Sequence, residues 1–201
     1  MLLAKLQINF DQIKNILMRF LVTGATGLIG KKITEIILNR GDKLSVLTTN
    51  KKYLTNSNHS IDYYYWNPEL GVIDENCIDG VDIVINLAGS PIAQLWTKKA
   101  KTSILDSRVK SVNLLEKIIL NDNKRNIKQF ACASAIGIYP SKMNIEFNEK
   151  SKSFSKSFLG ETVRKWEDSC LSIEKSNIKV LKLRIGLVLS MDGGLLKPIS
   201  F

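Results

Sequence analysis

Three glycines between an apolar strand and an amphipathic helix are the residues of this sequence best suited to chemistry. Gly24, Gly27 and Gly30 follow a strand predicted at 19–23 and lead into a helix predicted at 28–39. Gly24 permits a sharp turn, Gly27 lets a pyrophosphate approach the backbone, and Gly30 lets the helix pack closely on the sheet. The helix then points its free N–H groups at the phosphates. The context favours nucleotide binding over a turn that serves packing alone.

The end of the second predicted strand, at 44–48, bears on the type of nucleotide. In sites selective for NAD, an Asp or Glu at this point holds the ribose 2′-hydroxyl. This sequence has no acid there and instead reads Thr48-Thr-Asn-Lys-Lys52. Threonines and lysines would accept a 2′-phosphate, which a carboxylate would repel. The predicted cofactor is therefore NADP, with NAD possible, although the lysines could simply begin a solvated loop.

Two further strand ends carry small or hydroxyl residues. Ala88 and Gly89 would let the cofactor lie against backbone, or they could form an ordinary strand-end turn. Ser134 follows the fifth strand, where a nicotinamide and a substrate would meet, and it could bind substrate or only cap the strand. The predicted cofactor-binding residues are Gly24, Thr26, Gly27, Leu28, Ile29, Gly30, Thr49, Lys51, Lys52, Leu87, Ala88 and Gly89.

Composition excludes several other classes of function. The 201 residues are 44% hydrophobic, which is enough for one core, and no apolar run is long enough to span a bilayer. Three widely spaced cysteines indicate reduced thiols and a cytoplasmic protein. His59 is the only histidine and falls in a polar loop, so no metal site or Ser-His-Asp triad is predicted. The net charge of +10 comes from scattered lysines without an aromatic platform, so nucleic-acid binding is not predicted.

Residues 1–17 form a segment separate from the predicted domain at 18–201. Apolar residues at alternating three- and four-residue steps could form one helical stripe; they are Leu3, Leu6, Phe10, Ile13 and Leu17. The segment has neither the apolar core nor the cleavage site of a secretory signal. Because Met18 directly precedes the first strand, we interpret 1–17 as an extension produced by an upstream start.

Past Met18 the sequence alternates strands and helices. Further strands are predicted at 61–66, 81–87, 128–133 and 179–189, and further helices at 97–120 and 156–175. In the first helix, Ile33, Ile36 and Ile37 are predicted to face inward. This order predicts an α/β fold with a doubly wound, parallel sheet and right-handed crossovers, a Rossmann-like NAD(P)-binding domain. Ligands should bind at the carboxyl ends of its strands.

Several motifs together resemble the extended and atypical short-chain dehydrogenases/reductases. The resemblance is greatest to a subfamily labelled as predicted nucleoside-diphosphate-sugar epimerases or as cell-division-inhibitor-like proteins. It covers about residues 18–201. The motifs are Gly24-Ala-Thr-Gly-Leu-Ile-Gly30, Asn86-Leu-Ala-Gly89, Ser107-Arg108-Val109, Ser134-Ala-Ile-Gly-Ile-Tyr139, Trp166-Glu167 and Arg184-Ile-Gly-Leu-Val-Leu189.

The sequence departs from this family in two places. The superfamily's reductases need a Tyr with a Lys four residues later, and no tyrosine here satisfies that spacing. Ser134 and Tyr139 remain the predicted catalytic residues. Family members also continue beyond this chain, so we expect a C-terminally truncated protein without its substrate lobe.

The predicted function is an NAD(P)-binding epimerase or oxidoreductase acting on a sugar nucleotide or another carbonyl or alcohol substrate. Two alternatives remain open. One is a non-catalytic nucleotide-binding regulator connected with division, and the other is an inactive truncated product.

Overall fold

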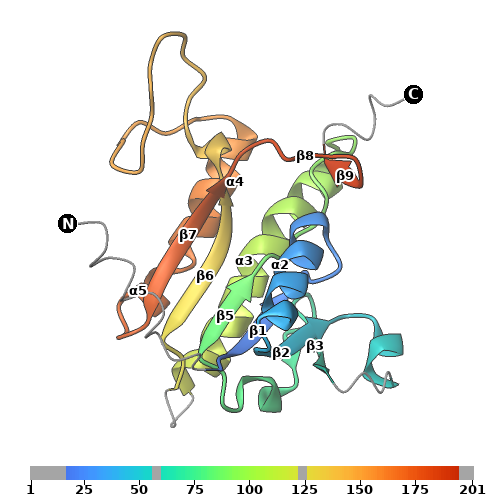
Figure 1. Cartoon of the computed structure of the whole chain (residues 1–201). Helices are drawn as coiled ribbons and strands as arrows, with labels where there is room; N and C mark the ends of the chain where they lie inside the picture. The colour runs from blue at the N-terminus through green and yellow to red at the C-terminus, as the bar shows by residue number, and fades with distance from the viewer. Residues whose placement is uncertain (1–16, 56–59, 122–125, 195–201) are drawn as a thin grey trace, which may run out of the picture.

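The computed structural model describes residues 17–55, 60–121 and 126–194. His59 and the predicted helical stripe, apart from Leu17, lie outside the described residues. The described chain forms one seven-stranded sheet with helices on both faces (Figure 1).

The sheet has the strand order β4-β3-β2-β1-β5-β6-β7 and is parallel except for β4. Its chain path runs outward from the centre through β2 and β3, then returns to the other side of β1 as β5, β6 and β7. The predicted doubly wound α/β fold is thus confirmed, with the reversal of strand order between β1 and β5. The strands are β1 Arg19–Thr23, β2 Lys43–Thr48, β3 Ile61–Asn67, β4 Val72–Ile73, β5 Ile83–Asn86, β6 Gln129–Ala135 and β7 Lys179–Ile185.

Helices α2, α3, α4 and α5 cover the sheet unequally. In Figure 1, α2 lies in front of the sheet, whereas α3 and α4 lie behind it. The shorter described elements are 3₁₀ helices and a hairpin formed by β8 and β9. Their bounds are α2 Leu28–Asn39, α3 Lys98–Asn121, α4 Phe158–Asp168, α5 Leu171–Glu174, η1 Lys51–Thr55, η2 Glu75–Ile78, η3 Ile136–Ile138, β8 Leu189–Ser190 and β9 Gly193–Gly194.

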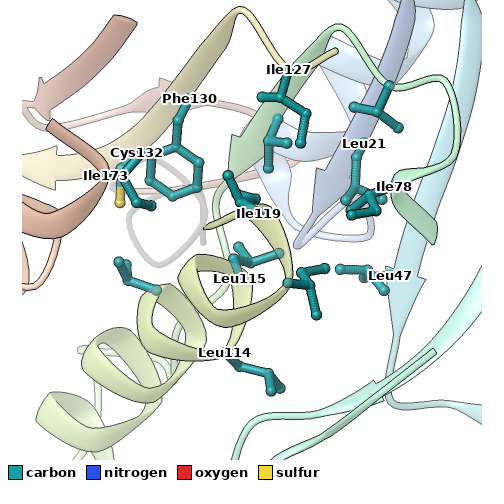
Figure 2. Packing of buried hydrophobic residues seen from close by; sticks show 14 of the residues in the cluster. Leu21, Leu47, Ile78, Leu114, Leu115, Ile119, Ile127, Phe130, Cys132 and Ile173 are labelled. Carbon is teal, nitrogen blue, oxygen red and sulfur yellow. The ribbon is translucent and has the colours of Figure 1, made fainter. Parts of the chain in front are cut away.

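The larger core lies between α3 and the sheet. Apolar residues recur along α3 at helical spacing, so Val112, Leu115 and Ile119 all reach the sheet. Figure 2 shows Leu115 and Ile119 on this helix, facing the region of Leu21 and Phe130. Truncating a fully buried side chain of this kind costs about 2–5 kcal/mol. This packing fixes the strand ends against which a ligand would lie.

Four details of the predicted elements were wrong. Ile36 is 51% exposed because it lies off the stripe that Ile33 and Ile37 present to the smaller core. The helix expected at 156–175 is broken into α4 and α5, where the Ser169 hydroxyl donates to the Trp166 carbonyl. The strand expected at 179–189 ends at Ile185, before a separate hairpin.

The fourth detail concerns strand 81–87, which shortens to 83–86 at both ends. The N–H of Val81 bonds the Ile78 carbonyl in a turn, and the N–H of Leu87 is shared between the carbonyl and the hydroxyl of Thr23 where the strand ends. The antiparallel edge strand β4 was not predicted at all. A strand of two residues is too short to show a period in the sequence.

Candidate functional site

The glycine turn joins β1 to α2 and is shaped by two close approaches. Gly24 has a φ of +68°, and a Cβ built there would lie 2.8 Å from the carbonyl group of Leu87. A Cβ on Gly30 would overlap the carbonyl oxygen of Gly24. The predicted sharp turn at Gly24 is confirmed. Gly30, however, makes room for the turn itself and not for the sheet, which corrects the sequence interpretation.

Gly27 is the N-cap of α2, and no side chain caps this helix end. The first intrahelical bond of the helix runs from the N–H of Lys31 to the Gly27 carbonyl. The N–H groups of Leu28, Ile29 and Gly30 therefore have no partner within the helix. An uncapped N-terminus with a positive dipole end fits an anionic group such as a pyrophosphate.

A cleft of about 780 Å³ lies over the carboxyl ends of the central strands, next to this turn. One wall comes from β2, η1 and β3, including Thr48, Tyr53 and Tyr63. The opposite wall comes from the end of β5 and from α3, including Ser107. Five predicted cofactor residues line the cleft, namely Gly24, Thr26, Thr49, Ala88 and Gly89.

The other predicted cofactor residues lie near the cleft without lining it. Leu87 is partly buried below it, and the side chain of Leu28 lies against Gly193 of β9. Lys51 and Lys52 are in η1, where the Nζ of Lys51 lies 5.2 Å from the centre of the Tyr65 ring. Gly27, Ile29 and Gly30 are the remaining predicted cofactor residues that do not line the cleft.

Aromatic rings line the β2 side of the cleft, and two carboxylates line it from other elements. Tyr53 stacks on Tyr63 with ring centres 5.3 Å apart. The end of β2 carries no acid, as the sequence indicates, but Glu69 and Asp106 line the cleft from other elements. Both carboxylates pair with Lys110, at 2.6 Å and 3.2 Å respectively. Their negative charge at the wall is therefore partly neutralised.

A buried polar network holds the strand ends together beneath the cleft. The Thr23 hydroxyl donates to Asn86 Oδ1 at 2.6 Å and accepts the N–H groups of Leu87 and Ala88, each at 3.1 Å. Asn86 Nδ2 in turn donates to the Ser111 hydroxyl on α3 at 3.1 Å. Sequence reasoning missed this network. The sequence does show a polar residue at the end of each of the two apolar strands, Thr23 and Asn86, which could have indicated it.

The two predicted catalytic residues, Ser134 and Tyr139, lie in one hydrogen-bonded cluster. The Ser134 hydroxyl, only 3% exposed, donates to Glu167 Oε1 on α4. Glu167 also accepts two bonds of 2.9 Å from Arg184 on β7, through Nε and Nη2. The Nη1 of Arg184 donates to the Tyr139 hydroxyl at 2.6 Å, and that hydroxyl donates to the Asn148 carbonyl at 2.9 Å.

Charge compensation keeps the Glu167 carboxylate ionised in this cluster. Burial alone would raise the pKa of Glu167, but hydrogen bonds from Arg184 and Ser134 and the positive charges of Arg184 and Lys182 outweigh it, so the pKa is lowered. The same carboxylate raises the pKa of Arg184. The sequence motifs that contain Glu167 and Arg184 predicted no role for either residue. The structure shows that they connect the two predicted catalytic residues.

The part of the chain that the structure describes lacks the features of a metal site and of a membrane span. Within it, no cluster of three His, Cys, Asp or Glu side chains could hold a metal ion. None of its helices is both long and apolar enough to cross a membrane. Cys77, Cys132 and Cys170 are free and buried, and burial raises the pKa of the Cys77 thiol to about 12.

Known proteins share this sequence pattern and this fold. Residues 20–189 match the model of the NAD dependent epimerase/dehydratase family. An epimerase family protein of Staphylococcus saprophyticus is 34% identical over 177 residues, which cover 88% of this chain and 57% of that protein.

Two solved structures resemble the fold at lower sequence identity. A nucleoside-diphosphate sugar epimerase of Corynebacterium glutamicum superposes with a TM-score of 0.77 at 23% identity, over 98% of this chain and 40% of its own. A human epimerase family protein solved with NADPH gives 0.75 at 24% identity, over 91% of this chain and 58% of its own.

This chain therefore belongs to the NAD dependent epimerase/dehydratase family, and it spans less than two thirds of the length of these relatives.

Proposed function

We propose that this chain supplies the nicotinamide-dinucleotide site of an epimerase or oxidoreductase. The observation that carries the proposal is the cleft of about 780 Å³ beside an uncapped helix N-terminus. This cleft lies where the strand order reverses, between β1 and β5, which is the place where doubly wound sheets bind dinucleotides. Gly27 supports the same proposal because the surrounding protein explains its lack of a side chain only weakly. A Cβ there would contact only the Gly24 carbonyl oxygen, at 3.3 Å, so the approach of a ligand is the better reason for a glycine. Family membership adds that the dinucleotide is a nicotinamide one.

NADP is the cofactor that we propose, with NAD as the alternative. No carboxylate follows β2, and Thr49 at its end lines the cleft. Lys51 and Lys52 follow within η1, close enough in sequence to reach a 2′-phosphate by side-chain rotation. The human protein of similar fold that was solved with NADPH agrees with this choice.

Ser134 and Tyr139 are the residues that we propose for handling the substrate oxygen. A bound nicotinamide exchanges hydride with a substrate carbon, and the protein must then bind or exchange the proton on the attached oxygen. Ser134 lies at the end of β6 and its hydroxyl donates to Glu167, and Tyr139 lies beside the cationic Arg184. The described helix α4 contains no tyrosine, so the usual Tyr and Lys arrangement is replaced in this proposal.

The proposed substrate is a sugar nucleotide or another molecule with a carbonyl or alcohol group. The name of the Corynebacterium protein supports the first class. Relatives are longer than this chain, so we propose that residues 18–201 form the cofactor domain and that a substrate lobe belongs to the part of the relatives that this chain does not span. We keep residues 1–17 as a separate extension. The free, buried cysteines are compatible with the proposed cytoplasmic location.

A second candidate function is nucleotide binding without catalysis, as in a regulator connected with division. The favouring observation is that both proposed catalytic hydroxyls already bond within the protein, Ser134 to Glu167 and Tyr139 to Asn148. Each hydroxyl would have to keep or exchange such a bond when it meets a substrate.

Calorimetric titration of the full chain with NADPH and NADH tests the shared premise of both candidates. We expect both to bind, with NADPH the tighter ligand. Binding of neither would refute the proposed dinucleotide site. Because the proposed substrate lobe lies outside this chain, a screen of sugar nucleotides against an NADP-loaded longer relative, followed by absorbance of the reduced nicotinamide, then separates hydride chemistry from binding alone.

A further inference from the structure

Arg108 is a buried cation whose position the proposed function does not explain. It lies in the middle of α3, is 7% exposed, and its Nη1 donates to the Ile104 carbonyl at 2.8 Å and to the Ser90 carbonyl at 3.2 Å. Its guanidinium lies 5.2 Å from the centre of the Trp166 ring. Burial lowers its pKa, and no carboxylate opposes this effect among the described residues. A buried charge without a counter-ion is costly, so its contacts need a reason.

The contacts of Arg108 converge on the turn that follows β5. The Ser107 hydroxyl accepts the N–H of Ser90 at 2.9 Å, and the Ser103 hydroxyl lies 3.1 Å from that of Ser90. Together with the bond from Arg108, these contacts connect Ser90 to three residues of α3. They are Ser103, Ser107 and Arg108, which lie within little more than one helical turn. The turn is thus attached to the helix through its N–H, its carbonyl and its side chain.

Gly89 lies between this attachment and the cleft. A Cβ built on Gly89 would lie 3.2 to 3.4 Å from the Cζ, Nη1 and Nη2 atoms of Arg108. The guanidinium therefore occupies the space that a side chain at position 89 would need. Gly89 also lines the 780 Å³ cleft, as do Ala88 and Ser90. A shift of the guanidinium would accordingly shift this wall of the cleft.

This wall is the one expected to meet the nicotinamide half of the dinucleotide. In doubly wound sheets the ribose of the adenosine half is held at the end of the second strand, and the dinucleotide crosses the point where strand order reverses. Here the β2 and β3 ends would take the adenosine, and β1 the pyrophosphate. The Gly89–Ser90 turn, across the reversal on β5, is left for the second nucleoside.

We propose that Arg108 is a positioning residue that fixes the backbone of Gly89 and Ser90 as the support for the nicotinamide half of the cofactor. The proposal rests on the proposed dinucleotide site. An arginine suits this role because its planar group can pack against the Gly89 backbone, stack on Trp166 and donate to two carbonyls at once. A lysine at the same position offers one compact ammonium and cannot fill that plane.

The test compares Arg108→Met and Arg108→Lys with the wild type and with Arg164→Met, an exposed arginine on α4. Calorimetry measures the affinity of the full chain for NADPH, for NADH and for ADP, which lacks the nicotinamide half. For both Arg108 variants we expect about tenfold weaker binding of the whole dinucleotide, the effect of losing one net hydrogen bond, and an unchanged affinity for ADP. Arg164→Met should match the wild type for all three ligands.

Gly89→Ala provides a second variant that does not remove the charge. Its Cβ should displace the guanidinium and weaken dinucleotide binding, and Arg108→Met should make the added methyl group tolerable. The two substitutions should therefore be non-additive in dinucleotide affinity. If Arg108→Met does not fold, Arg108→Lys and Gly89→Ala decide the matter.

The outcomes separate this inference from its premise. A wild-type chain that binds neither dinucleotide overturns the proposed site and the role of Arg108 together. A wild-type chain that binds, with Arg108 variants that melt earlier but bind dinucleotide normally, overturns only the positioning role. Equal losses for ADP and for the whole dinucleotide would do the same.

Discussion

Removing one partner of the buried ion pair between Glu167 and Arg184 should destabilise the protein at the β6 and β7 ends. The Glu167→Gln substitution keeps the side-chain volume and one acceptor for Ser134, but it leaves the Arg184 guanidinium without a carboxylate. The two side chains are only 8% and 18% exposed. Breaking one partner of a buried pair costs about 3–5 kcal/mol, and the retained hydrogen bonds reduce our expectation to about 2–3 kcal/mol.

Urea denaturation followed by circular dichroism would measure this loss as a lower midpoint at constant slope. For a chain of this size, the melting temperature should fall by about 4–12 °C. The matched control is Glu35→Gln, which breaks a surface pair with Lys32 whose side chains are 55% and 69% exposed. That control should cost less than about 0.5 kcal/mol. If the two substitutions proved equally mild, the reasoning about the buried pair would be refuted.

The pH dependence of stability gives an independent check on Glu167. Its pKa is lower in the folded protein than in the unfolded chain, so the folded state is stabilised above the unfolded pKa of about 4.3. This contribution should disappear as the pH falls from there through the folded pKa. The Gln variant has no such group. The difference in unfolding free energy between wild type and variant should therefore be constant near neutral pH and shrink on acidification.

Three further predictions concern the strand ends and the cofactor. Gly30→Ala should destabilise the fold and abolish dinucleotide binding because its Cβ overlaps the turn, whereas Gly27→Ala should melt near the wild-type temperature and weaken binding; equal melting temperatures for both would contradict the geometry. Thr23→Val should cost about 1–3 kcal/mol in urea denaturation, because it leaves buried polar partners unsatisfied, and a neutral result would mean that the network is dispensable. Replacing Lys51 and Lys52 by Ala should weaken NADPH far more than NADH in calorimetry, and equal losses would refute a 2′-phosphate contact.

The sequence was sufficient to predict features that depend on local patterns. The glycine turn, the alternation of strands with helices, and the C-terminal glycine of α2 each follow from residues close together in the chain. Gly41, for example, has the φ of +79° that such a glycine provides. Parallel strands have their carboxyl ends at one edge, so the order of the elements was enough to predict the edge at which the cleft lies.

Contacts between distant segments could not be predicted in the same way. Ser134 and Arg184 are cross-strand partners in the register of β6 and β7, and a slip of one residue would turn one of them to the other face. Glu167 reaches both only because α4 packs behind these strands. Arg108 likewise meets Gly89 only through the packing of α3. Pairings of this kind depend on tertiary geometry, which a single sequence leaves open.

The hydrogen-bond directions in the Ser134 cluster restrict the chemistry that our proposal allows. Ser134 directs its proton to Glu167, and Tyr139 directs its proton to the Asn148 carbonyl. Both hydroxyl oxygens can then offer only lone pairs to a ligand unless a bond is exchanged. A substrate hydroxyl donates a proton and meets this arrangement directly, whereas a substrate carbonyl needs a donor and requires Ser134 or Tyr139 to turn. Under the proposed function, the cluster would therefore favour a reaction that begins from an alcohol, with an oxidised nicotinamide as the hydride acceptor. In the proposed function, the ionised Glu167 accepts the Ser134 hydrogen bond and so keeps the Ser134 oxygen turned as an acceptor, which would let the site bind an alcohol without the Tyr and Lys pair.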